Sequence, residues 1–175
     1  MDFVKTVTAA VLFAAMPAWA GDLTAAQSNA VRSAWGYLES QPFSKIGLIK
    51  QLASPHGSDY GTADATAAVN SLKVDWYEQA VLSARGYLES QGFSRQGLIK
   101  QMTSSAGSGF EMTDATTAVD SLKVDWNQQA VRSAKAYMEY QGFSCKGLVK
   151  QLSSSAGSGF TEAQATHGAK QAGAC

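Results

Sequence analysis

Three lysines recur at intervals of fifty residues, and each is followed by a glutamine: Lys50, Lys100 and Lys150. Two more cations, Arg95 and Lys146, lie close to the start of the same segments. Cations that recur every fifty residues can form a solvated outer face, or they can form a row of positively charged sites that face a binding partner. We take these five residues as the candidate partner-binding surface and keep the solvated face as the alternative.

The chain has two cysteines, Cys145 and Cys175, and the second is its last residue. An even cysteine count in an oxidising compartment indicates a disulfide, which would fasten the C-terminal end to the third unit. Two unpaired thiols are the alternative. No histidine flanks either cysteine, so the pair does not form a metal site.

The residues that usually carry catalysis are few. His56 and His167 are the only histidines, and neither recurs between the units. No G-x-S-x-G motif is present, and the Gly-Ser-Gly segments at 107–109 and 157–159 lack the Lys-Ser/Thr of a phosphate loop. The acidic residues Asp75 and Asp125 suit helix caps better than a facing carboxylate pair. We therefore expect no enzymatic activity, no metal and no cofactor.

A fifty-residue repeat must position these residues. Residues 73–110 and 123–160 are identical at 26 of 38 positions. Side chains of four kinds recur in strict register in all three units: Tyr37, Tyr87 and Tyr137; Phe43, Phe93 and Phe143; Gly47, Gly97 and Gly147; Gln51, Gln101 and Gln151. Tandem copies of one supersecondary unit give such a pattern. Several near-copies suit a binding surface better than one asymmetric catalytic site.

The second unit begins with an amphipathic helix of about four turns that starts at Trp76. Asp75 is the expected N-cap, with Glu78 completing a capping box. Asp125 with Gln128 repeats the pair in the third unit, and Thr24 with Gln27 does so in the first. The helix should end near Gly92, which can adopt a left-handed cap. By their spacing, Trp76 and its equivalent Trp126 belong to the small core of their own unit. An exposed aromatic stripe that binds a partner is the alternative.

Two shorter helices complete the unit. Ser94 is a second expected N-cap, and the helix over 95–102 turns Leu98, Ile99 and Met102 inward. A loop over 104–109 follows, and Phe110 closes it against the core. The third helix is expected to start at Thr113. The fold class is therefore all-α, with three tandem three-helix repeats at 21–73, 74–123 and 124–175. Rigid stacking and a row of separate units both remain open.

Residues 1–20 form an expected signal peptide. A short basic start, an apolar stretch and Ala18-Trp19-Ala20 before Gly21 predict cleavage between Ala20 and Gly21. Export to the periplasm or the medium follows from this. The formal net charge of zero favours neither nucleic acid nor an anionic membrane as a partner.

The unit resembles the repeat of the Ltp-type host-cell-surface lipoproteins. The residues that carry the resemblance in the second unit are Ala80-Val81, Ser83-Ala84, Tyr87-Leu88-Glu89, Phe93-Ser94, Gly97-Leu98-Ile99, Gln101, Phe110, Asp114-Ala115, Ala118-Val119 and Val124-Asp125-Trp126. The resemblance extends from about Leu23 to Gln171. It implies exported, helix-turn-helix-like units without enzymatic activity.

The resemblance also implies a role. Members of this family act in phage superinfection exclusion, in which they hinder the entry of a second phage's DNA, with the injected tape-measure protein as suspected target. Those lipoproteins carry an acylated cysteine after the signal, whereas this chain has Gly21 there, so no stable membrane anchor is expected. The alternative function is a structural or adhesive envelope protein that binds a host protein or the cell wall.

Overall fold

The computed structural model describes residues 23–175, and within that range it contains nine α-helices and no strand. The first repeat holds α1 (Ala25–Ser40), α2 (Lys45–Ala53) and α3 (Thr62–Ser71). The second holds α4 (Trp76–Ser90), α5 (Arg95–Thr103) and α6 (Met112–Ser121). The third holds α7 (Trp126–Tyr140), α8 (Cys145–Ser153) and α9 (Glu162–Gln171). The predicted all-α fold of three three-helix repeats is confirmed. The predicted signal peptide and its cleavage site lie outside the described residues.

Each repeat has a small core of its own. In the second repeat, the inward face of α5 is formed by Leu98, Ile99 and Met102, which are 0%, 9% and 0% exposed. Phe110 closes the loop after α5 and is also buried, as predicted. Small residues such as Ala80 and Ala115 line the facing sides of α4 and α6, so these helices approach each other closely. Between residues 23 and 175, no helix combines the length and the apolar character that a membrane span needs.

The helix starts depart from the predicted pattern in detail. Asp75 caps α4 by accepting from the backbone amides of Tyr77 and Glu78, but the reciprocal bond that would complete a capping box is not formed. Asp125 caps α7 in the same one-sided way. The capping box predicted at Thr24 and Gln27 in the first repeat is complete, and this prediction is confirmed. The helix predicted to start at Thr113 starts at Met112 instead, after an N-cap residue whose side chain makes no capping bond.

The prediction that Gly92 takes a left-handed cap is wrong. The chain leaves α4 through Gln91 in an extended conformation, and Gly92 is not among the residues with positive φ. Gly92 instead allows helix α7 of the next repeat to lie close to the chain at this point. A Cβ at Gly92 would lie 2.6 Å from both the carbonyl oxygen of Gln129 and the amide nitrogen of Ser133, in helix α7 of the next repeat. Sequence spacing gave no sign of this contact between repeats.

The loop after each short helix has one repeated geometry. In the second repeat, the amides of Gly107 and Gly109 both donate to the carbonyl of Ser104, at 3.0 and 3.1 Å. Gly109 and its equivalent Gly159 have φ of 65° and 67°, a region that favours glycine. Asp59 takes the same conformation in the first repeat, with φ of 53°.

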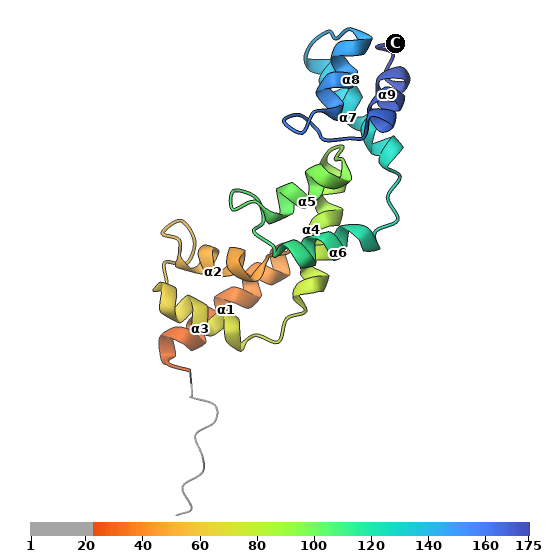
Figure 1. Cartoon of the computed structure of the whole chain (residues 1–175). Helices are drawn as coiled ribbons and strands as arrows, with labels where there is room; N and C mark the ends of the chain where they lie inside the picture. Colours follow the sequence, from red (N-terminus) through yellow and green to blue (C-terminus); the bar gives the residue numbers. More distant parts are fainter. Residues whose placement is uncertain (1–22) are drawn as a thin grey trace, which may run out of the picture.

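The repeats form a staggered row rather than a tightly stacked solenoid, with the first repeat at the bottom of Figure 1 and the third at the top. All the extensive helix-to-helix packing lies inside single repeats. Trp76 nevertheless packs on the core of the first repeat and Trp126 on the core of the second. The two tryptophans were predicted to belong to the core of their own unit. They pack on the preceding unit instead, because each is the first residue of its helix and only four residues separate it from the last helix of that unit.

In the third repeat, the residues after α9 take the place that a tryptophan of the following repeat has on the first two cores. Ala172 and Ala174 pack on its core. A disulfide joins Cys145 at the start of α8 to Cys175, with 4.7 Å between their Cα atoms. The predicted bridge is thus confirmed, and it holds the tail against the core.

Candidate binding grooves between the repeats

Two polar contacts recur between adjacent repeats. In one, the backbone amides of Phe43 and Phe93 donate to the side-chain oxygens of Gln79 and Gln129 of the next repeat, at 3.3 and 3.4 Å. The other joins a serine to a loop. The hydroxyl of Ser44, the N-cap of α2, donates to the carbonyl oxygen of Ser108 in the loop of the second repeat, at 2.5 Å. Ser94 makes the same bond to Ser158 of the third repeat, at 2.6 Å. Each hydroxyl also accepts from the amide of a glycine three residues on, at 2.9 Å. A Cβ on Gly47 would lie 2.9 Å from the Ser44 hydroxyl oxygen and 3.2 Å from the Ser108 carbonyl oxygen, so a side chain there would crowd both partners of this bond.

A tyrosine of the long helix holds each of these loops from inside its own repeat. The hydroxyl of Tyr87 lies 2.8 Å from that of Ser108. The same pairing joins Tyr37 to Ser58 and Tyr137 to Ser158, at 3.2 and 3.3 Å. Hydrogen bonds from Gln51 and then Ser58 lower the pKa of the Tyr37 hydroxyl. Each loop is therefore held by a tyrosine of its own repeat, in addition to its contact with the preceding repeat.

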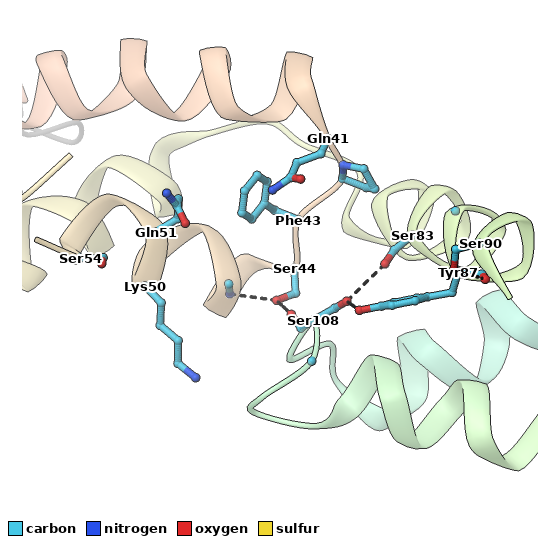
Figure 2. Close-up of a pocket in the computed structure, with 14 residues that line it drawn as sticks. Gln41, Phe43, Ser44, Lys50, Gln51, Ser54, Ser83, Tyr87, Ser90 and Ser108 are labelled. Carbon is cyan, nitrogen blue, oxygen red and sulfur yellow. Dashed lines mark hydrogen bonds between the residues drawn. The ribbon is translucent and has the colours of Figure 1, made fainter. Parts of the chain in front are cut away.

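An open groove of about 660 Å³ runs beside the first of these contacts. Figure 2 shows Ser44 and Ser108 bonded at the groove, with the Tyr87 hydroxyl directed at Ser108 from the other side and Lys50 projecting from α2 into the open space. Its remaining lining is mostly polar or small: Gln41, Pro42, Phe43, Gly47, Gln51, Ser54, Ser83, Gly86, Ser90 and Gly107. Such a surface offers donors and acceptors to an extended polypeptide.

A second groove of about 420 Å³ lies at the equivalent place between the second and third repeats. Lys100 and Gln101 occupy the positions of Lys50 and Gln51. Larger side chains narrow it, since Tyr140 and Ala136 stand where the first groove has Ser90 and Gly86. Tyr140 is 90% exposed, whereas an aromatic ring of this size is usually at least partly buried. This exposed ring gives the second groove an apolar contact that the first lacks.

The five cations predicted to bind a partner divide into three groups. Lys50 and Lys100 line the two grooves. Lys150 has the equivalent position in the third repeat but lines neither groove, and Lys146 is exposed at the start of α8. Arg95 is already engaged, because its Nε and Nη2 atoms donate to Asp120 at 2.6 and 2.7 Å. That bond lowers the pKa of the Asp120 carboxyl. The two grooves thus contain two of the five predicted residues.

The hydroxyl and amide groups of the grooves were missed by sequence reasoning, which took the Gly-Ser segments as plain loops. A signal was available. Ser44, Ser94 and Ser144 recur in register, each three residues before a glycine. Of these, Ser44 and Ser94 are buried at 3% and 1%, whereas Ser144 is exposed. An N-cap serine with a buried hydroxyl needs a second partner, and that partner is the loop of the next repeat.

Among the described residues, no other group of side chains is arranged as a metal site or a catalytic site. Across residues 23–175, no group of three or more His, Cys, Asp or Glu side chains is placed to hold a metal ion. His56 and His167 are both exposed, as predicted. The grooves offer neutral hydrogen-bonding groups, two lysines and one exposed tyrosine ring, an arrangement suited to recognising a polypeptide.

The three repeats match one protein-family model, described as host cell surface-exposed lipoprotein, at residues 25–72, 75–122 and 125–171. The chain belongs to the Ltp family. Among solved structures, this Ltp-family chain is similar to Ltp, a superinfection exclusion protein from the Streptococcus thermophilus temperate phage TP-J34. The identity is 26% and the TM-score 0.51, over 57% of this chain and 98% of that one. The match therefore spans about two of the three repeats. No curated protein matches the chain.

Proposed function

We propose that this chain is an exported superinfection exclusion protein that binds an injected protein of an incoming phage through the grooves between its repeats. The observation that carries the proposal is the pair of equivalent grooves, each lined by serine, glutamine, tyrosine and lysine, in a chain of the Ltp family. Superinfection exclusion is the activity named for the similar Ltp of phage TP-J34. The tape-measure protein is the target we favour, since it is the suspected target of the Ltp-type lipoproteins that this chain resembles.

The chemistry of the grooves suits a long, extended and polar partner. Serine and glutamine side chains can bond to an extended backbone, and Lys50 and Lys100 add one positive charge to each groove. Two like sites on one chain also raise the apparent affinity for a repetitive partner, because the second contact is intramolecular. A tape-measure protein in the act of injection is extended and would offer both sites a segment at once.

The location we propose is extracytoplasmic and without a lipid anchor. Gly21 stands where an acylated lipoprotein has cysteine, and the disulfide between Cys145 and Cys175 suits an oxidising compartment. Cleavage after Ala20 would release the mature chain. The N-terminal sequence of the purified exported protein tests the cleavage site.

Infection of cells that express the chain tests the function. We expect plating efficiency to fall for at least one phage while adsorption stays normal and DNA entry is lost. Reversing the groove charges with Lys50→Glu and Lys100→Glu should restore plating. Lys123→Glu is the matched control, because Lys123 is exposed and lies outside both grooves.

Normal DNA entry of every phage tried, with the protein verified as exported, would overturn the proposal. Retention of the protein on purified cell wall, together with unimpaired infection, would instead support the structural or adhesive alternative.

A further inference from the structure

The contact between adjacent repeats uses two different faces. We call the residues that follow a long helix the C-face; in the second repeat these are Gly92, Phe93, Ser94 and Gly97. We call the residues that meet them the N-face; in the third repeat these are Gln129, Arg132, Ser158 and Gly159. Two interfaces inside the chain use these faces. The C-face of the third repeat and the N-face of the first repeat are left over in the described residues.

The leftover C-face keeps the features that docking requires. Gly142 is the equivalent of Gly92, and a Cβ there would meet nothing within 4 Å. Gly147 is the equivalent of Gly97, and a Cβ there would meet side chains of its own repeat only. Ser144 still caps α8 through the amide of Gly147, with its hydroxyl exposed. A Cβ on Gly147 would lie 3.0 Å from the capping hydroxyl of Ser144, so the helix cap accounts for that glycine, whereas nothing inside the third repeat accounts for Gly142.

The leftover N-face keeps the matching shape. The amides of Gly57 and Asp59 donate to the carbonyl of Ser54 at 2.8 and 3.1 Å, as in the loops of the other two repeats. Val31 is only partly buried, whereas its equivalents Val81 and Val131, in repeats that have a preceding neighbour, are 5% and 6% exposed. The first repeat therefore presents a formed but uncovered docking loop.

We propose that a second copy of this chain docks the N-face of its first repeat on the C-face of the third repeat, reproducing the interface found between the second and third repeats. The occupant is thus another copy, and the association is head-to-tail. The proposal does not depend on the function proposed above.

The charged groups of the two faces are complementary in this arrangement. Within the chain, Arg132 donates to the backbone carbonyls of Leu88 and Glu89 at the end of α4. Arg32 occupies the equivalent place on the free N-face and would meet the end of α7, where Met138 and Glu139 carry the equivalent carbonyls. A cation at a helix C-terminus is favourable. Arg32 is exposed in the single chain.

A second charge pair would form at the rim. A Cβ on Gly159 would lie 3.8 Å from the Oε1 atom of Gln96, so these two positions face each other across the interface. Their equivalents on the free faces are Asp59 and Lys146, which are both exposed and opposite in charge. The formal net charge of zero adds no overall repulsion between copies.

The first repeat has no tryptophan at the position of Trp76 and Trp126, and this difference is compatible with the proposed contact. Trp76 and Trp126 complete the core of the preceding repeat, but the first repeat has Ala26 at that position. The third repeat needs no such side chain, because Ala172 and Ala174 already cover its core. The small Ala26 therefore meets a surface that the C-terminal tail has completed.

The contact is heterologous, so repetition of the step gives an open row of copies or a closed ring. Each junction would create a further groove with Lys150 and Gln151 on one side and Ser33 and Tyr37 on the other. These are the equivalents of residues that line or support the grooves inside the chain. Lys150 would then have the same setting as Lys50 and Lys100.

Sedimentation of the mature chain with its disulfide intact, over concentrations from about 1 µM to about 1 mM, tests the proposal. We expect the weight-average mass to rise with concentration. Gly142→Leu should block the C-face and Arg32→Glu should weaken the N-face, each reducing self-association at least about tenfold. Arg85→Glu is the matched control, because Arg85 is exposed on the second repeat, away from the leftover faces.

Mixing the two blocked variants decides the geometry. Gly142→Leu keeps a free N-face and Arg32→Glu keeps a free C-face, so an equimolar mixture should form a dimer and nothing larger. Circular dichroism must show that both variants are folded, and the absence of a structural neighbour at Gly142 favours this. A wild type that stays monomeric at every concentration would overturn the proposal. So would association that neither variant weakens, or blocked variants that fail to pair when mixed.

Discussion

The hydroxyl of Ser94 donates a 2.6 Å hydrogen bond to the carbonyl oxygen of Ser158, which lies 64 residues further along the chain. The same hydroxyl caps α5 by accepting from the amide of Gly97 at 2.9 Å. One small side chain therefore both starts a helix and fixes the angle to the next repeat. Ser44 does the same between the first and second repeats.

Replacing Ser94 by alanine should therefore cost more than the loss of a helix cap. We expect Ser94→Ala to destabilise the chain by about 1 kcal/mol for the cap and a further ~1–3 kcal/mol for the carbonyl left without a partner. Ser144→Ala is the matched control, because Ser144 caps α8 with no bond to another repeat among the described residues. Urea unfolding of both variants checks this, and equal costs would contradict the double role of Ser94.

Gly92 and Gly142 form a second matched pair. Alanine at position 92 places a Cβ 2.6 Å from backbone atoms of α7, so Gly92→Ala should force the second and third repeats apart. Alanine at position 142 has free space and should leave the unfolding free energy almost unchanged. Small-angle scattering of both variants measures the change in shape. A Gly92→Ala chain with an unaltered scattering profile would contradict the close approach.

The individual repeat was predictable from sequence because its information is local. Helix periodicity and N-cap serines located α5 almost to the residue and identified Phe110 as the residue that closes the core. Cysteine count and compartment predicted the bridge between Cys145 and Cys175. These features depend on residues within one unit of fifty.

The relation between repeats was not predictable in the same way, because it depends on contacts across units. Trp76 has the spacing of a core residue, and spacing does not reveal that the core belongs to the preceding repeat. Gly92 looks like a helix stop, although it serves the approach of α7. The cations were identified by their charge, whereas the serines that build the grooves are neutral and common, so the sequence did not single them out.

A contact inside one repeat was also missed. Arg95 was grouped with the free cations because its partner Asp120 lies 25 residues away.

The disulfide should stabilise the third repeat selectively. In the chain-entropy model, a bridge that spans 30 residues contributes between about 3 and 4 kcal/mol. We expect the double variant Cys145→Ser, Cys175→Ser to lower the melting temperature of the third repeat and to separate its transition from that of the others. Arg95→Gln is the comparison, since Arg95 has the equivalent position and its exposed ion pair contributes at most about 1 kcal/mol. Calorimetry of both variants checks the order, and a smaller loss for the double variant would contradict it.

Gly107 should tolerate no side chain. A Cβ there would lie 1.9 Å from the carbonyl oxygen of Gln101, so Gly107→Ala must displace the loop that carries Ser108. We expect a loss of stability of at least about 1 kcal/mol together with loss of the contact to Ser44. Gly86→Ala is the opposite case, because Gly86 lies in α4 with nothing within 4 Å, and alanine there should stabilise by up to about 1 kcal/mol. Thermal unfolding of the two variants should shift in opposite directions, and a shift in the same direction would contradict this account of the loop.

The central claim is that the grooves between repeats recognise a phage protein. Tyr140 offers the most direct test, because its ring is exposed and lines the second groove. A photo-crosslinking amino acid at position 140, activated in cells during infection, should capture a phage protein. The same group at position 112 is the control, because Met112 is also exposed, at 60%, and lies outside both grooves. A crosslink to an injected phage protein from position 140 alone is the predicted result. No phage protein captured at 140, or equal capture at both positions, would contradict the claim.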